Sequence, residues 1–202
     1  MCDVPSDPDL RMACPRSRDS IRRDTYLLRA KLGLSDTPYF PILHFIEHVL
    51  PSIDPTFILE VVDDGSLSQI QAEYIPQVNT IRVKRSVYDA AVVGHWLARA
   101  TMAHELGHYY YHDEKNVRYA KLVPGQRIPP DYDPERQANV FAAELLAPIN
   151  LISGMHKEQV GKEFGVSYQV ARRQLLALDK IRSRQRRKKQ QKKKAAKQKP
   201  DR

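Results

Sequence analysis

The sequence has few cysteines, no long apolar run and no secretory signal. Its two cysteines, Cys2 and Cys14, lie near the N-terminus and lack the spacing of metal ligands. No apolar stretch approaches the roughly 20 residues that span a membrane, and the N-terminus is polar, with Asp3, Asp7 and Asp9. These absences exclude a disulfide framework and predict no membrane span. We therefore expect a cytoplasmic protein with free thiols.

Positive charge is concentrated at the C-terminus. The 202 residues carry a net charge of +9, but residues 180–202 alone contain 13 Lys or Arg residues and one Asp. The 179 residues before them hold 20 basic and 23 acidic groups, so the body of the protein is slightly acidic. With almost no apolar residues, 182–202 is predicted to be a disordered basic tail. Such a tail is either simply solvated or attracts nucleic acid without sequence preference.

Two histidines and a glutamate form the pattern His-Glu-x-x-His at residues 104–108. Residues 96–112 are good helix formers and apolar residues, which predicts a helix. On this helix His104 and His108 share a face and can bind one metal ion, while Glu105, roughly 100° round the axis, can reach a water on that metal. The alternative is a pair of surface histidines, because so short a pattern also arises by chance. The burial expected for this helix favours a metal site in which Glu105 is the general base for amide hydrolysis.

Further residues of this helix suggest roles around the site. His112 continues the face of the two histidines but lies too far along for a compact site, so we place it beside a ligand or in the substrate cleft. Gly107 costs a helix about 1 kcal/mol relative to Ala, and its small size lets another backbone approach closely. One of Tyr109 to Tyr111, or Tyr132, is a candidate to stabilise an oxyanion. His44 and His48 are also four apart, but Glu47 is wrongly placed between them, so we expect surface or interface histidines.

A catalytic zinc takes three protein ligands, so a third must come from elsewhere. Asp133 as N-cap, Pro134 at the first helical position and Pro148 as terminator predict a second amphipathic helix. Its predicted core stripe consists of Ala138, Phe141, Ala142 and Leu145.

Two carboxylates of this second helix compete for the third position. Glu135, 27 residues after His108, has Asn139 one turn further on the same face, where an amide can orient a ligand histidine. Glu144 is the competing ligand. It lies about 180° round the helix from Glu135, so both cannot face the metal.

The two motifs together resemble the ImmA/IrrE family of metallo-endopeptidases. The resemblance rests on His-Glu-Leu-Gly-His at 104–108 and on Glu-x-x-Ala-Asn-x-Phe-Ala-Ala-Glu-Leu-Leu-x-Pro at 135–148, and it extends over about residues 21–182. Ala100 departs from the family's usual pattern before the first motif, which alters packing but no ligand.

The resemblance implies a minimal gluzincin-like domain that binds Zn²⁺, or Mn²⁺ as the alternative, through His104, His108 and Glu135 rather than Glu144. It also implies a protein substrate. Family members are associated with mobile elements and stress responses and act on helix-turn-helix repressors.

The rest of the chain predicts an α+β fold with a small antiparallel sheet packed on helices. Helices are expected at 20–31, capped by Ser20, at 38–50, ended by Pro51, and at 87–94. Short strands are expected at 56–62, 70–75 and 79–84. The sheet either holds an extended substrate along 71–75 or 80–84, or merely covers the helices. The loop over 116–131 is expected to rim a cleft.

Residues 157–175 resemble a helix-turn-helix, with Ser167 as N-cap of the second helix. In the family a similar segment serves packing or substrate docking, and DNA reading is the alternative. We therefore expect a disordered leader at 1–19, a metallopeptidase domain at 20–150, a helix-turn-helix-like segment at 151–181 and the basic tail at 182–202.

The predicted function is zinc-dependent cleavage of a DNA-binding repressor. The alternative from a different class is a non-catalytic regulator or toxin–antitoxin partner that binds protein or DNA. The intact Glu105 favours the enzyme, because binding alone needs no base.

Overall fold

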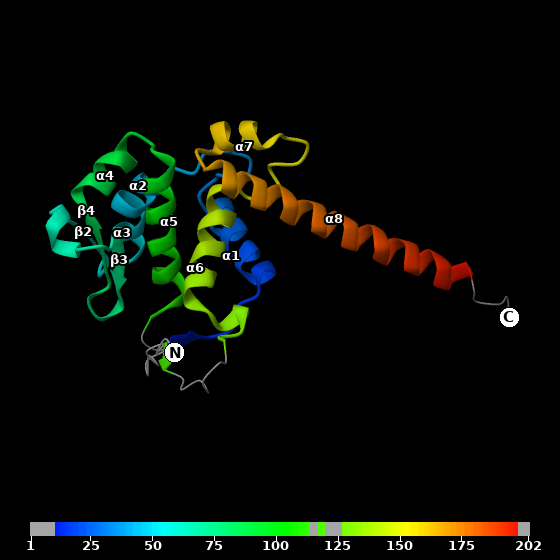
Figure 1. Ribbon diagram of the computed structural model, residues 1–202, viewed down its shortest axis with the longest axis horizontal. Coiled ribbons are helices and arrows are strands. Elements are labelled where there is room, and N and C mark those ends of the chain that lie inside the picture. The colour runs from blue at the N-terminus through cyan, green and yellow to red at the C-terminus, as the bar shows by residue number, and fades with distance from the viewer. Residues whose placement is uncertain (1–10, 114–116, 120–126, 198–202) are drawn as a thin grey trace, which may run out of the picture.

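The computed structural model describes residues 11–113, 117–119 and 127–197. It has an α+β fold. Two helices stand side by side at its centre, a small sheet lies on one side of them, and a long C-terminal helix projects from the other side (Figure 1). Within the residues described, no helix combines the length and apolar content that crossing a membrane requires.

The central helices are α5 (Trp96–Tyr111) and α6 (Pro134–Leu146), which pack against each other (Figure 1). Asp133 caps α6, since its carboxylate accepts hydrogen bonds from the backbone N–H groups of Glu135, at 3.0 Å, and Arg136, at 3.2 Å. Both predicted helices are confirmed. Fully buried side chains on the two helices include Met102, Ala103, Leu106, Ala138, Phe141 and Leu145.

Helix α1 (Arg18–Lys31) packs along α6 and begins earlier than predicted. Ser17, not Ser20, is its cap, and the Ser17 Oγ accepts a hydrogen bond from the Ser20 backbone N–H at 3.2 Å. Before α1, strand β1 (Arg11–Ala13) pairs antiparallel with β5 (Val117–Tyr119). Residues 11–19 are therefore structured, whereas their composition predicts a disordered leader. Composition alone does not reveal the strand that pairs with β1, because that strand lies far along the chain. The remainder of that leader, residues 1–10, lies outside the described residues.

The sheet is mixed, which corrects the predicted antiparallel sheet. Its order is β2 (Ile58–Val62), β4 (Thr80–Lys84), β3 (Ala72–Ile75), with β2 parallel and β3 antiparallel to β4. The turn η3 (Pro76–Val78) joins β3 to β4, whereas β2 leads through the short helix η2 (Asp64–Leu67) into β3. Strand β4 lies at the centre and is the most buried of the three, with Ile81 and Val83 at 0% exposure. Both its edges are paired, so it has no edge left for an added substrate strand.

Two further helical segments pack against α5, and the second of them also packs against the sheet. The predicted helix over 38–50 is α2 (Ile42–His44), the π-helical turn η1 (Phe45–Val49) and α3 (Leu50–Ile53). The helix continues through Pro51 instead of ending before it. Proline clashes with the carbonyl one turn earlier and donates no hydrogen bond, and the wider π turn directly before it accommodates both defects. Helix α4 (Arg85–Val92) follows β4 and corresponds to the helix predicted at 87–94.

The C-terminal segment has two helices, α7 (Lys157–Phe164) and α8 (Tyr168–Lys197), joined at Gly165 with φ +61°. The predicted cap of α8 is present, since the Ser167 Oγ accepts a hydrogen bond from the Val170 backbone N–H at 3.2 Å. Arg99 of α5 fastens the end of α7 by donating to the carbonyls of Phe164 and Gly165, each at 3.2 Å.

Helix α8 extends through residues 182–197, which composition had placed in a disordered tail (Figure 1). The sequence has no glycine or proline between Gly165 and Pro200. Lys, Arg, Gln and Ala are all good helix formers, and this local propensity favours continuation of a helix that α7 and α6 already anchor. Residues 198–202 lie outside the described chain.

Candidate metal centre

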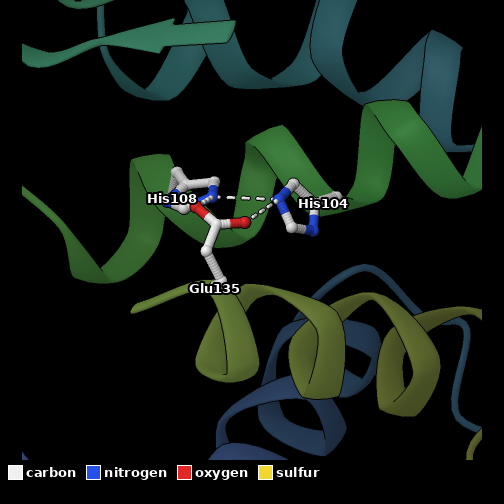
Figure 2. A group of neighbouring side chains, drawn as sticks. All are labelled: His104, His108 and Glu135. Atoms are coloured by element: carbon white, nitrogen blue, oxygen red, sulfur yellow. Dashed lines mark hydrogen bonds and ion pairs between the residues drawn. The ribbon is translucent and has the colours of Figure 1, made fainter. Parts of the chain in front are cut away.

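His104 and His108 of α5 and Glu135 in the first turn of α6 point toward one another (Figure 2). The Nε2 atoms of the two histidines are 3.0 Å apart. The Glu135 Oε2 lies 3.2 Å from the His104 Nε2, and its Oε1 lies 3.3 Å from the His108 Nε2. The structure thus brings the three predicted ligands together from two helices that are separate in the sequence.

The donor set fits a divalent ion such as zinc. Two imidazole nitrogens and a carboxylate are ligands that zinc takes. In a tetrahedral site with arms of about 2.0–2.1 Å, ligand atoms stand about 3.3 Å apart, close to the 3.0–3.3 Å observed. The His104 and His108 side chains are 21% and 15% exposed and that of Glu135 is 67% exposed. The site is therefore enclosed on the histidine side and open on the glutamate side.

The three groups stabilise one another electrostatically. Hydrogen bonds with His104 and then His108 hold the pKa of the Glu135 carboxyl far below its usual range. Burial disfavours the charged form of His104, but its hydrogen bond with Glu135 and the nearby carboxylates outweigh burial and raise its pKa. A cation at this point would take the place of the proton between His104 and Glu135.

Glu105 lies on the sheet side of α5 and is 7% exposed. Burial raises the pKa of its carboxyl to about 6, against the opposing effect of His104 and His108. The carboxylate accepts a hydrogen bond from the backbone of Tyr74 in strand β3. Glu105 thus lies between the two histidines and an edge strand, with a pKa suited to proton transfer near neutral pH.

The two other predicted site residues lie on opposite sides of the cluster. Asn139 is exposed, donates to the Glu135 backbone carbonyl at 2.7 Å, and its side chain also hydrogen-bonds with His104. His112 is 5% exposed, with its Nδ1 2.8 Å from the His108 Nδ1. His112 therefore lies beside His108, and its ring is shielded from solvent.

Glu144, the competing candidate, faces away from the histidines. It is fully buried, and its carboxylate accepts from the Arg18 Nε at 2.8 Å and the Arg22 Nε at 3.0 Å. Its role is to join α6 to α1. The exposed pair His44 and His48 is likewise outside the cluster of three.

Two of the candidate oxyanion tyrosines have hydroxyls engaged elsewhere. Tyr109 donates to the Asp54 carboxylate at 2.9 Å, and Tyr111 donates to the Asp24 carboxylate at 3.0 Å. Tyr110 and Tyr132 are 38% and 37% exposed and remain the candidates for contact with a substrate.

Sequence reasoning missed Gln137. It is fully buried, and its Oε1 lies 3.0 Å from the His112 Nε2. Its position could have been noticed, because it precedes Phe141 by one turn and so falls within the apolar stripe of α6. A polar side chain there must find hydrogen-bond partners inside the protein.

Residues 98–176 match the family model described as IrrE N-terminal-like domain, Peptidase_M78. No curated protein matches the chain. A solved structure, described as a Mycobacterium tuberculosis transcriptional regulator, shares the fold with a TM-score of 0.50 and 12% sequence identity. The match covers 76% of this chain and 45% of that protein, so the chain spans less than half of the regulator's length.

The matched segment contains both helices that carry the converging ligands and extends into α8. The predicted family resemblance is thereby confirmed. Residues 98–176 are thus similar to the IrrE N-terminal-like, Peptidase_M78 family, whose name denotes a peptidase.

Proposed function

We propose that this protein is a zinc-dependent endopeptidase of the cytoplasm that cleaves a DNA-binding repressor of a mobile element or stress response. The observation that carries the proposal is the convergence of His104, His108 and Glu135 with a buried carboxylate, Glu105, beside them. A bound Zn²⁺, or Mn²⁺ in its place, would supply Lewis acidity toward the scissile carbonyl and would acidify water at the site.

Glu105 is the proposed general base and, after proton uptake, the general acid for the leaving amine. Its pKa of about 6 leaves it ionised at neutral pH, yet basic enough to hold a proton transiently. The hydrogen bond from the Tyr74 backbone fixes the carboxylate against the sheet. Asn139, which contacts His104, would hold that ring in its ligand orientation.

The proposed substrate strand adds to β3. This strand is an edge of the three-stranded sheet and packs against α5, whereas β4 is paired on both sides. Because the Tyr74 backbone reaches the Glu105 carboxylate, a peptide extended along β3 would pass directly by the proposed base. The edge therefore supports a protein substrate in extended form.

The proposed substrate class rests on the family and on the fold. The family resemblance implies a repressor as substrate, and the solved structure with a similar fold is that of a transcriptional regulator. A repressor acts where DNA is transcribed, which is why we place the enzyme in the cytoplasm.

The decisive experiment is incubation of zinc-loaded protein with the repressor encoded beside it, followed by mass spectrometry of the fragments. We expect defined fragments from the native protein and none from Glu105→Gln, which retains all three ligands. Zinc content measured on both proteins should be equal. An intact repressor after incubation with zinc-loaded native protein would overturn the proposal.

A second candidate function is nucleic-acid binding without sequence preference. Helix α8 projects from the body, and its residues 182–191 are exposed on every side (Figure 1). The exposed cations are Arg182, Arg184, Arg186, Arg187, Lys188 and Lys189. Such a helix favours contact with backbone phosphates, and this contact would bring the protein to DNA-bound substrates or serve a purely regulatory role.

A further inference from the structure

Gln137 has an amide whose orientation is determined by its surroundings. The fully buried side chain donates through its Nε2 to the backbone carbonyls of Cys14, at 2.9 Å, and Asp131, at 2.8 Å. Carbonyl oxygens only accept hydrogen bonds, so the amide nitrogen must face them. The Gln137 Oε1 must therefore face the opposite way, toward His112.

This orientation determines which nitrogen of His112 carries a hydrogen. The His112 Nε2 lies 3.0 Å from the Gln137 Oε1, which can only accept, so Nε2 must be the N–H. A ring that is 5% exposed favours the neutral form, because burying an extra charge is costly. A neutral imidazole has a single N–H, and the Nδ1 of His112 is then a lone-pair acceptor.

The acceptor nitrogen of His112 in turn determines that the Nδ1 of His108 carries a hydrogen. The two Nδ1 atoms are 2.8 Å apart, so one of them must donate, and His112 cannot. The hydrogen therefore sits on the Nδ1 of His108. Its Nε2, which points toward His104 and Glu135, is then the nitrogen left to bind a metal ion (Figure 2).

We propose that Gln137 and His112 are positioning residues that hold His108 in the tautomer able to bind a metal ion. The inference rests on the proposed metal site but not on proteolysis. A ligand histidine generally donates its second N–H to an acceptor that fixes its tautomer and ring orientation. Here the acceptor is a second imidazole, which adds no negative charge to the site.

The chain of hydrogen bonds also extends beyond the two ligand helices. Cys14 follows β1, and Asp131 belongs to η4 (Pro130–Tyr132), the short helix before α6. Through Gln137 the segments that precede α1 and α6 control a ring nitrogen at the metal site.

The test uses metal-free native protein with ¹⁵N-labelled histidine. Long-range proton–nitrogen correlation spectra distinguish a protonated from an unprotonated ring nitrogen. We expect the hydrogen of His108 on Nδ1 and that of His112 on Nε2. A native His108 without a hydrogen on Nδ1 would overturn the proposal without any variant.

Variants then test the cause. Gln137→Leu and His112→Phe should shift His108 away from the Nδ1–H form and weaken zinc binding about 10- to 100-fold in chelator competition. His112→Gln, which offers an amide oxygen to His108, should recover part of that affinity. Gln159→Leu, at an exposed residue of α7, is the matched control and should change neither quantity. An unchanged tautomer and affinity in Gln137→Leu would contradict the proposed role. If the native protein shows the expected ring hydrogens on His108 and His112 but does not cut the repressor, only the proposed peptidase function is refuted.

Discussion

Gly107 of α5 and Ala138 of α6 are in backbone contact. A Cβ atom at residue 107 would lie 2.9 Å from the Ala138 Cα and 3.2 Å from its carbonyl oxygen. The glycine directly precedes His108, and Ala138 lies three residues after Glu135. The absence of a side chain at 107 therefore sets the distance between the two helices that carry the ligands, which offsets the roughly 1 kcal/mol that glycine costs a helix.

Gly107→Ala should separate the ligands. The new methyl group would push α6 away from α5, because its nearest neighbours are backbone atoms that cannot rotate aside. We expect a loss of about 1–3 kcal/mol in the free energy of unfolding. We also expect zinc affinity to fall about tenfold or more, measured by chelator competition. Gly65→Ala is the control, since a Cβ there meets nothing within 4 Å. Zinc affinity equal to that of the native protein would show that the contact does not position the site.

Glu135→Gln and Glu144→Gln should have opposite effects. Glu135→Gln should abolish tight zinc binding and leave the fold intact, because its side chain is 67% exposed. Glu144→Gln should keep the zinc site but remove the partner of Arg18 and Arg22. We expect this change to lower the free energy of unfolding by roughly 2–3 kcal/mol, less than for a fully buried pair because both arginines reach solvent. Zinc content and thermal denaturation of both variants separate the two roles, and loss of zinc from Glu144→Gln would contradict our assignment.

Asp54 should contribute stability that disappears in acid. Hydrogen bonds from Thr56, Asn79 and Tyr109 lower the pKa of its carboxyl to about 2, from a usual value near 4. Since the folded-state pKa is depressed, this stabilisation is complete above pH 4 and is lost as the pH falls toward 2. We expect about 1 kcal/mol, reduced by solvent screening because the side chain is partly exposed.

Thermal denaturation between pH 2 and pH 6 measures this contribution of Asp54. In Asp54→Asn the stability should vary less with pH over this range than in the native protein. Parallel curves for the two proteins would mean that the three hydrogen bonds do not favour the ionised carboxylate.

Removal of residues 184–202 should leave folding and zinc binding unchanged. The proposed ligands all lie in α5 and α6, and residues 184–191 are exposed. Affinity for random duplex DNA should fall about tenfold or more, and the dependence of the remaining affinity on salt should be weaker. Titrations at two salt concentrations measure both quantities.

A matched variant separates charge from helix length. Replacing the five cations Arg184, Arg186, Arg187, Lys188 and Lys189 by glutamine keeps good helix formers in place, and it should weaken DNA binding in the same direction as truncation. Equal DNA binding by the native and truncated proteins would indicate that the first turns of α8, which the truncation retains, contact the DNA. Loss of the zinc site on truncation would show that the distal helix is structural.

Local periodicity and capping in the sequence are sufficient to predict several features of the fold. The helical repeat places His104 and His108 on one face, and Asp133 and Pro134 specify where α6 begins. The small residue expected at the closest backbone approach is Gly107. Even α8 was encoded locally, by a long stretch without glycine or proline, although its charge had suggested disorder.

Which side chains and strands meet could not be predicted from local patterns and depends on how the chain packs. Strand β4 is central because two strands pair with it, and its alternating pattern alone did not show this. Gln137 gained its role from the carbonyls of Cys14 and Asp131, and Glu144 gained its role from arginines of α1. This is because a helix or strand specifies the faces of its own side chains, whereas their partners come from segments that only packing brings together.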